Sequence, residues 1–321
     1  MPSSTILSSP ALDVVNVSYA YATRVALTDI SLTVRSGEIF GLLGPNGSGK
    51  TTLFRILATL ALPSTGNATI LGNDILDRPE AVRRNIGVVF QSFGLDKKLT
   101  VLENLTHQGR LYGLSGSMLQ EKARAVLVRL GVWDRKHELV ERLSGGLQRR
   151  VEIAKGLLHR PKLLIMDEPS TGLDPGSRIE LWRLLEDLRR SDGTTILLTT
   201  HLLDEADRCD RIALFDRGRL VTAGTPSDLK GTIGGDIIYV SGADPLQLAT
   251  RIKRTLRVKA MVVNGIIHIE RENGHRFIPK LIEAFPKEIQ SVTVGKPTLE
   301  DVFVKYTGHG FVETSNESLP L

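Results

Sequence analysis

The chain contains very little cysteine and lacks long apolar runs. Cys209 is the only cysteine among the 321 residues, so no disulfide can form within the chain, as expected in a reducing cytosol. No run of about 18 apolar residues occurs, and the sequence therefore predicts no membrane-spanning helix. Residues 1–10 contain no Lys or Arg and lack the apolar region of a secretory signal peptide. We expect residues 1–11 to form a disordered extension.

The charge balance argues against a further class of function. The formal net charge is +5, from 41 basic and 36 acidic residues. This modest excess comes without a Lys/Arg-rich block and without aromatic residues interleaved among basic ones, so we expect no nucleic-acid partner. The length exceeds the size at which one hydrophobic core stops growing, which predicts two domains.

A glycine-rich loop between a predicted strand and a predicted helix is typical of phosphate binding. The apolar run 39–43 predicts a buried strand, and apolar residues from Leu53 to Leu60 follow at helical spacing. Such a loop holds phosphates on backbone N–H groups at the helix N-terminus, its lysine adds positive charge, and the next hydroxyl reaches Mg²⁺. The predicted nucleotide-binding residues here are Gly44, Pro45, Asn46, Gly47, Ser48, Gly49, Lys50, Thr51 and Thr52.

Two carboxylates follow a second apolar run. Residues 163–166 predict a central buried strand that leads into Asp167 and Glu168. Open α/β sheets bind their ligands at the carboxyl ends of such strands. Asp167 is suited to hold Mg²⁺ together with Thr51, and Glu168 is suited to orient and polarise water as a general base.

Other polar residues end predicted strands at the same edge. Residues 195–200 predict a strand that runs into His201, whose imidazole can hydrogen-bond a phosphate oxygen. Gln91 follows the apolar run 87–90, where its amide can ligate Mg²⁺ or water, although spacing alone also fits an ordinary polar residue at a strand end. Asp174 lies in a turn, where it either caps the next helix or reaches another chain.

Residues 143–148, which we call the signature segment, begin another predicted helix. Ser144 is the predicted N-cap, and Gly145 and Gly146 leave backbone amides open. A helix N-terminus carries roughly half a positive charge and attracts anions. The signature segment is therefore a second anion site, well separated in sequence from Lys50.

Together these motifs resemble the ATP-binding subunit of ABC transporters over residues 12–229, in the order found in that family. The resemblance implies ATP and Mg²⁺ as ligands. It implies the roles of Q-loop glutamine for Gln91, Walker B aspartate for Asp167, catalytic glutamate for Glu168, D-loop aspartate for Asp174 and switch histidine for His201. Tyr21 falls where the family places an aromatic side chain that stacks on adenine, with Tyr19 as the alternative.

The resemblance also implies a fold. The family has an α/β, P-loop NTPase architecture, in which a RecA-like parallel sheet core carries an antiparallel β edge and a helical subdomain, here about residues 92–158. Within this subdomain, apolar residues from Leu119 to Leu130 predict a helix. We expect a capping box of Ser117 and Gln120 to open it and Gly131 to close it.

A second copy of the chain is part of this expectation. In the family, the signature segment closes on the ATP held by the opposite subunit, so two copies complete two sites and we expect a homodimer. Leu147 stands where the family usually has glutamine, which leaves open whether closure is weakened. Ser144, Gly145 and Gly146 keep the groups that would face phosphate, so we expect ATPase activity to survive.

The C-terminal third predicts a second domain. A hairpin turn at Arg217-Gly218 is followed by linker signals at 224–227 and 231–235. The first domain is then the ATP-binding domain, 12–229. Alternating strand and helix patterns predict a small accessory α+β domain over 230–309, which we interpret as ferredoxin-like. Without a Cys/His cluster or phosphate loop, this domain is expected to be regulatory or dimer-stabilising. Residues 310–321 are expected to form a flexible tail.

Residues 297–308 resemble the C-terminal segment of one branch of the family. That branch exports drugs, antibiotics, lipids or polysaccharides through a separately encoded membrane permease. The resemblance therefore implies a peripheral ATPase on the cytoplasmic face of the cell membrane. The alternative is a soluble ABC ATPase that acts on ribosomes or DNA, which a single nucleotide unit and the lack of a long coiled-coil insertion disfavour. A non-hydrolysing binding module is disfavoured by Glu168 and His201.

Overall fold

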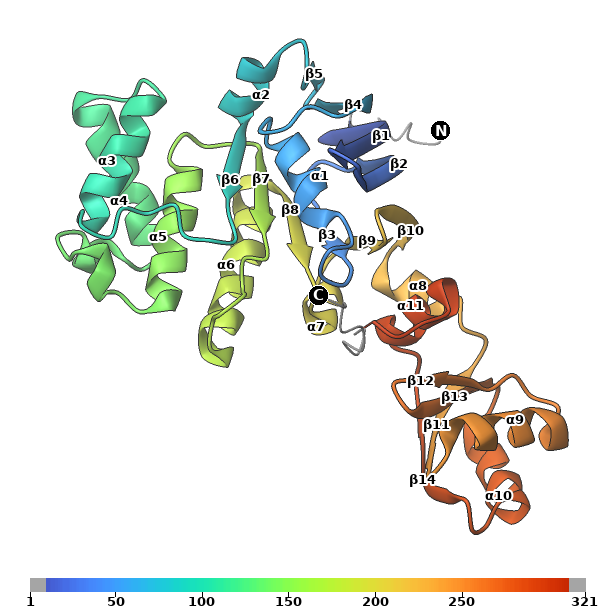
Figure 1. Ribbon diagram of the computed structural model, residues 1–321. Helices are drawn as coiled ribbons and strands as arrows, with labels where there is room; N and C mark the ends of the chain where they lie inside the picture. Colours follow the sequence, from blue (N-terminus) through green and yellow to red (C-terminus); the bar gives the residue numbers. More distant parts are fainter. Residues whose placement is uncertain (1–9, 312–321) are drawn as a thin grey trace, which may run out of the picture. The chain divides into compact units, whose positions relative to one another are not determined.

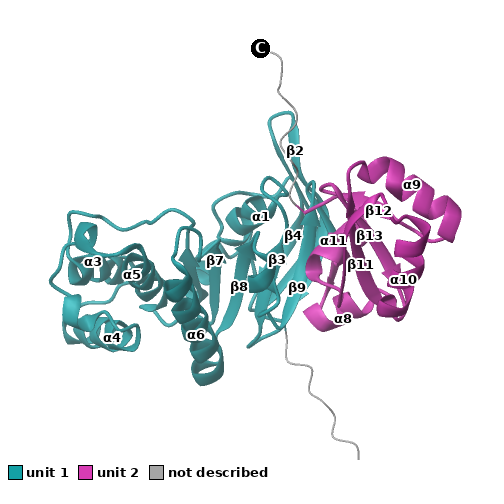
Figure 2. Ribbon diagram, turned by 90° about the horizontal axis from the view of Figure 1, so that it is seen from below, with its two compact units in different colours: residues 1–220 teal, residues 221–321 magenta. Residues whose placement is uncertain are grey.

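The computed structural model describes residues 10–311, which form two compact units (Figure 2). Unit 1 extends to Leu220, and unit 2 begins at Val221. The extension predicted over residues 1–11 and the tail predicted over residues 310–321 lie largely outside the described residues. No helix within the range 10–311 combines the length and the apolar character that crossing a membrane requires.

A six-stranded sheet lies at the centre of the described part of unit 1, in the order β10-β9-β3-β8-β7-β6 (Figure 1). Strands β9, β3, β8, β7 and β6 run parallel, and every residue of β3, β7 and β8 is buried. Burial on both faces explains why these strands appear as continuous apolar runs in the sequence. The strands span Ile39–Leu43 (β3), Ile86–Val89 (β6), Leu163–Asp167 (β7), Thr195–Thr200 (β8), Arg211–Asp216 (β9) and Arg219–Gly224 (β10).

Besides the helical subdomain, four helices of unit 1 lie between these strands in the chain: α1 (Lys50–Leu57), α2 (Pro79–Asn85), α6 (Pro175–Asp192) and α7 (Leu203–Ala206). Helix α1 starts directly after the glycine-rich loop, as predicted. The prediction that its apolar stripe continues to Leu60 is wrong. The helix ends at Leu57, Thr59 has a φ of 60° that helical backbone does not adopt, and Leu60 is 59% exposed.

The predicted antiparallel β edge is a second sheet in the order β2-β1-β4-β5. Its strands are β1 (Leu12–Tyr21), β2 (Arg24–Val34), β4 (Thr65–Ile70) and β5 (Asn73–Asp74). Apolar residues of this sheet pack with those of the parallel sheet and α1 in one hydrophobic core. The two sheets are therefore parts of one folding unit, which places the β1–β2 turn beside the glycine-rich loop.

The helical subdomain contains α3 (Val101–Leu111), α4 (Gly116–Arg129) and α5 (Gly145–Leu157), with short 3₁₀ turns at Trp133–Arg135 and Val140–Arg142 (Figure 1). The predicted capping box of Ser117 and Gln120 is wrong, because α4 begins one residue before Ser117 and its N-cap makes no side-chain hydrogen bond. Gly131 does close this helix, with a φ of 65°.

Unit 2 contains a four-stranded antiparallel sheet in the order β12-β13-β11-β14. Its elements are β11 (Asp236–Gly242), α9 (Pro245–Leu256), β12 (Met261–Val263), β13 (Ile266–Arg271), α10 (Gly274–Ala284) and β14 (Ile289–Gly295). This β-α-β-β-α-β order confirms the ferredoxin-like interpretation. Apolar side chains of α9 and α10 pack with those of the sheet in a core of their own.

The segment between hairpin and ferredoxin-like fold differs from the prediction. The hairpin turn is confirmed, since Arg217 and Gly218 both have positive φ, as a two-residue type I′ turn requires. The linker prediction is wrong over Pro226–Gly231, which forms helix α8, because Thr225 caps its N-terminus and Pro226 fits the first helical position. Helix α8 packs within unit 2 against α11 (Leu299–Thr307).

Candidate active site

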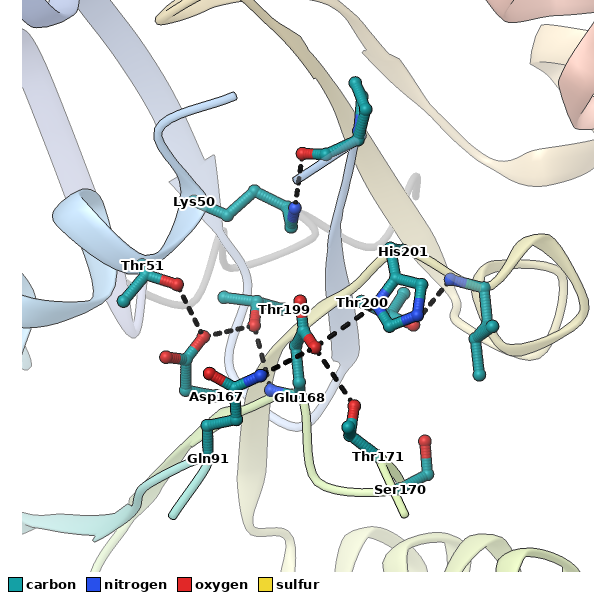
Figure 3. Close-up of polar contacts among 12 residues, drawn as sticks. Lys50, Thr51, Gln91, Asp167, Glu168, Ser170, Thr171, Thr199, Thr200 and His201 are labelled. Carbon is teal, nitrogen blue, oxygen red and sulfur yellow. Dashed lines mark hydrogen bonds and ion pairs between the residues drawn. The ribbon is translucent and has the colours of Figure 1, made fainter. Parts of the chain in front are cut away.

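The predicted site residues of four loops meet at the carboxyl edge of the parallel sheet (Figure 3). The glycine-rich loop follows β3, Gln91 follows β6, Asp167 and Glu168 end β7, and His201 follows β8. Parallel pairing of β3, β8, β7 and β6 brings their carboxyl ends to one edge. Open α/β sheets bind ligands in this position.

The glycine-rich loop has little room for side chains. A Cβ on Gly44 would lie 2.4 Å from the carbonyl oxygen of Phe215, and Gly49 has a φ of 103° with Ala26 O only 2.7 Å from an added Cβ. Lys50 is buried, and its Nζ donates hydrogen bonds to the carbonyl oxygens of Gly44 (2.8 Å) and Pro45 (2.9 Å). The ammonium group is thus held inside the loop, where phosphates of a nucleotide would lie.

Burial and the neighbouring carboxylates have opposite effects on the charge of Lys50. Burial lowers the pKa of Lys50, and the negative charges of Glu168 and Asp167 counter this effect. Burial raises the pKa of Asp167, although hydrogen bonds from Thr199 and Thr51 favour its charged form. Both shifts express the cost of placing charge in a desolvated site, a cost that a bound dication and phosphates would offset.

Asp167 accepts two hydroxyl hydrogen bonds on one oxygen. Its Oδ1 lies 3.2 Å from Thr51 Oγ1 and 2.5 Å from Thr199 Oγ1. A carboxylate beside a hydroxyl suits a hard dication such as Mg²⁺, so Asp167 and Thr51 fit the predicted metal position. Thr199 was not predicted, because a threonine inside an apolar strand carries no signal that separates it from the core.

Thr199 also positions the neighbouring residue. Its Oγ1 accepts a hydrogen bond from the backbone N–H of Glu168 at 2.9 Å while it donates to Asp167. Glu168 has a φ of 44°, an uncommon conformation for a residue other than glycine, and such backbone strain clusters at functional sites. One buried hydroxyl therefore binds both the carboxylate of Asp167 and the backbone of Glu168.

Three polar groups converge on a single oxygen of Glu168 (Figure 3). Its Oε2 accepts hydrogen bonds from Gln91 Nε2 (3.1 Å) and Thr171 Oγ1 (3.0 Å), and His201 Nδ1 lies 3.2 Å away. The His201 contact lacks hydrogen-bond geometry, and Nδ1 has no hydrogen-bond partner among the described residues, so this contact is one of proximity only. The site brings Gln91, Glu168 and His201 together, as predicted.

Glu205 is a further site residue that the sequence did not reveal. It is 1% exposed, accepts a hydrogen bond from Thr200 Oγ1 at 2.8 Å, and accepts a second from Ser170 Oγ. These bonds join the loop that follows Glu168 to the loop that carries His201. Glu205 lies on α7, four residues beyond His201, and no motif in the sequence marks it.

Tyr21 lines a cavity of about 580 Å³ together with the glycine-rich loop, Gln91 and Glu168. Its ring is 42% exposed and packs edge-on against Tyr19, with centroids 4.8 Å apart. Its hydroxyl lies 3.4 Å from Thr52 Oγ1, and this contact lowers the pKa of Tyr21 most. Arg24, from the same β1–β2 hairpin, also lines the cavity and was not predicted.

The signature segment does not contribute to this cavity. Ser144 caps α5 by accepting a hydrogen bond from Leu147 N–H at 3.4 Å, as predicted. A Cβ added to Gly145 would meet no described atom within 4 Å, whereas one added to Gly146 would lie 2.4 Å from Ser177 Oγ. The described lining of the cavity includes none of Ser144, Gly145 and Gly146.

Asp174 and Gln148 make local contacts at two helix starts. Asp174 caps α6, accepting hydrogen bonds from the backbone N–H (3.0 Å) and hydroxyl (2.6 Å) of Ser177, which confirms its capping role. Gln148 Nε2 donates to the carbonyl oxygen of Leu143 at 2.9 Å. Gln148 thus binds a carbonyl before the cap, whereas a capping box would need a side chain at Leu147 to accept from the Ser144 N–H.

Comparisons with known proteins agree with this geometry. The family model described as ABC transporter matches residues 27–171. The daunorubicin/doxorubicin resistance ATP-binding protein DrrA of Streptomyces peucetius is 37% identical over 91% of each chain. The Nod factor export ATP-binding protein I of Sinorhizobium fredii is 38% identical over 94% of this chain and 87% of its own. The chain therefore belongs to the ATP-binding proteins of ABC transporters.

Solved structures show the same fold. The cbiO1 protein of Clostridium perfringens, part of the ABC transporter complex cbiONQ, aligns with a TM-score of 0.65 and 28% identity over 77% of this chain and 96% of its own. A dimeric post-hydrolysis state of the ATP-binding cassette MJ0796, bound to ADP and Pi, aligns with a TM-score of 0.60 and 29% identity, covering 67% of this chain and 98% of its own. The predicted P-loop NTPase fold and ATPase class are confirmed.

Proposed function

We propose that two copies of the chain close around two ATP molecules. Each ATP would lie between the glycine-rich loop of one copy and the signature segment of the other. The proposal rests on one observation: Ser144, Gly145 and Gly146 lie at a helix N-terminus outside the cavity that contains Lys50, and Ser144 and Gly145 are exposed. The dimeric MJ0796 cassette with bound ADP and Pi is similar to this chain and supports a dimer.

Within each site we propose distinct roles for the chain's own groups. Lys50 and the loop amides hold the phosphates, and the Tyr21 ring stacks on adenine. Thr51, Asp167 and Gln91 would hold Mg²⁺, which would neutralise charge on the phosphates. Glu168 accepts a proton from water and orients it, because Gln91 and Thr171 hold its carboxylate in place and His201 lies beside it.

We propose that the chain powers export through a separate membrane permease. Relatives that match almost the whole chain are named for daunorubicin resistance and Nod factor export. The chain would then act as a peripheral protein on the cytoplasmic face of the cell membrane, with a drug, antibiotic, lipid or polysaccharide as cargo. The accessory domain over residues 230–309 would regulate the ATPase or stabilise its dimer, since the ATP site lies within residues 12–229.

The assignment of Glu168 is tested by Glu168→Gln in the full-length chain. We expect ATP turnover to fall by about 10²- to 10³-fold, because the amide cannot accept a proton from water. ATP binding should persist, because Lys50 and the glycine-rich loop are unchanged. Lys50→Ala is the matched control and should lose ATP binding itself. Unchanged turnover in Glu168→Gln would overturn the role of Glu168.

The permease is tested separately. The full-length tagged chain is purified from detergent-solubilised membranes of its own cells, and co-purifying proteins are identified by mass spectrometry. We expect an integral membrane protein in stoichiometric amount that raises the ATPase rate. Recovery of the chain with ribosomes or DNA instead would favour the alternative function.

A further inference from the structure

Helix α5, which begins at the signature segment, also binds the backbone of the loop around Gln91. Arg149 is 1% exposed, and its guanidinium donates hydrogen bonds to the carbonyl oxygens of Phe90 (2.7 Å) and Gln91 (2.9 Å). The same guanidinium lies 4.7 Å from the ring centroid of Phe93. Arg149 therefore holds three residues of the loop that follows β6.

Two further side chains of α5 bind the same loop. Glu152 is 3% exposed and accepts a hydrogen bond from Gly94 N–H at 3.0 Å, and Lys155 Nζ donates to the carbonyl oxygen of Gly94. Spacings of three residues place Arg149, Glu152 and Lys155 along one face of α5. Residues 90–94 are thus attached to the helix along about two of its turns.

The burial of two charged side chains, Arg149 and Glu152, is energetically unfavourable and calls for an explanation. Burial raises the pKa of Glu152 and lowers that of Arg149, which shows that the packing disfavours both charges. Apolar side chains of similar volume often serve packing equally well. A guanidinium can bind two successive carbonyl oxygens through two separate nitrogens, because its planar fork carries several donors in fixed directions.

The contacts continue from α5 to the general base. Arg149 holds the backbone of Gln91, and the side chain of Gln91 donates to Glu168 Oε2 at 3.1 Å. At the other end, the first turn of α5 begins at Ser144. A continuous path of hydrogen bonds and one helix therefore connects the signature segment to Glu168 of the same chain.

We infer that Arg149 is a positioning residue that links the two ATP sites of the dimer. This inference rests on the proposed function. There, the signature segment of one copy binds the ATP held by the glycine-rich loop of the other copy, whereas Glu168 acts on the ATP held by the glycine-rich loop of its own copy. When the signature segment binds the partner's ATP, α5 fixes the position of Gln91 through Arg149. The side chain of Gln91 in turn fixes the position of the Glu168 carboxylate.

The link is tested in a mixed dimer of two full-length copies that carry different affinity tags. One copy carries Glu168→Gln, so that only the ATP facing the intact Glu168 is hydrolysed. Arg149→Lys is then placed either in the copy with intact Glu168 or in the Glu168→Gln copy. Lysine keeps the charge but offers one nitrogen in place of the two that bind Phe90 and Gln91, and it lacks the planar fork.

The two placements have different expected results. In the copy with intact Glu168, Arg149→Lys should lower turnover about tenfold, because it releases Gln91 beside the acting base. In the Glu168→Gln copy, whose signature segment grips the hydrolysed ATP, turnover should change less than about twofold. Equal losses in both placements, a larger loss in the second, or no loss in either would overturn the inference.

Arg150→Lys is the matched control, because Arg150 lies next to Arg149 on α5 but binds Glu180 and the carbonyl oxygen of Leu130. It should leave turnover unchanged in either copy. Thermal unfolding of each variant checks that Arg149→Lys folds. Lys155→Met, at a partly exposed position, is a second variant tested in the same two placements. It should also lower turnover more in the copy with intact Glu168 than in the Glu168→Gln copy. If Glu168→Gln chains form no ATP-dependent dimer, the proposed function fails; if they do and the placements behave alike, only this inference fails.

Discussion

Thr199 shows how a single buried hydroxyl organises the chemistry at the residue scale. It donates to Asp167 and accepts from the backbone of Glu168, so the carboxylate beside the proposed metal position and the general base share one anchor. Glu205 works in the same manner for the loops around His201. The sequence predicted the charged ends of these strands, because strand ends are visible as breaks in apolar runs. It did not predict the hydroxyls, because their role arises only when two strands pair.

Thr199→Val tests this anchor, since valine keeps the shape of threonine and removes the hydroxyl. We expect the turnover number for ATP to fall about tenfold, because Glu168 N–H loses its acceptor and the backbone of the base loosens. ATP affinity should be unchanged. Thr195→Val is the control, because Thr195 begins the same strand and binds Gly37 N–H at the opposite edge. Equal turnover in the two variants would contradict the role of Thr199.

At the scale of elements, strands and locally determined caps were predictable, whereas helix ends set by tertiary packing were not. The strands containing the site are buried on both faces, so their apolar runs mark them clearly. Ser144 and Asp174 are N-caps that need only a side-chain oxygen and the next turn. Helix α4 lacks such a cap. Helix α8 is an exception among the local caps: Thr225 caps it, but Gly224 and Pro226 beside Thr225 also fit a linker, so the sequence alone does not separate the two.

Helix α11 of unit 2 carries a capping box that should make stability depend on pH. Burial of Asp301 would raise its pKa, but hydrogen bonds from His268, Thr298 and Tyr239 outweigh burial and hold it below the usual range. A lowered folded-state pKa gives stability that is present above the unfolded pKa of about 3.9 and is lost as pH falls below it.

Asp301→Asn should therefore lower the thermal unfolding midpoint of the full-length chain at neutral pH, and the difference from the unchanged chain should shrink as pH falls below about 4. Scanning calorimetry at several pH values measures this difference. Glu283→Gln on the exposed face of α10 is the control and should show little effect. A difference that stays constant with pH would contradict the ionised state of Asp301.

At the scale of the whole molecule, the proposed function gives one chain two separate half-sites. The phosphate loop, Glu168 and Tyr21 line the cavity around Lys50, and its described lining includes none of Ser144, Gly145 and Gly146. The motif order alone predicted the family and the P-loop NTPase fold, both of which the structural and sequence relatives confirm. Assembly follows from the resemblance and the open signature segment, and it remains a prediction because it concerns a second copy.

Sedimentation velocity of full-length chains in Mg²⁺ and ATP tests this assembly most directly. The Glu168→Gln chain should sediment as a dimer, because ATP stays unhydrolysed between the two copies. The double variant Glu168→Gln/Ser144→Arg should sediment as a monomer that still binds ATP, because the arginine side chain fills the helix N-terminus offered to the partner's phosphates. Identical sedimentation of the two variants would contradict a shared ATP site.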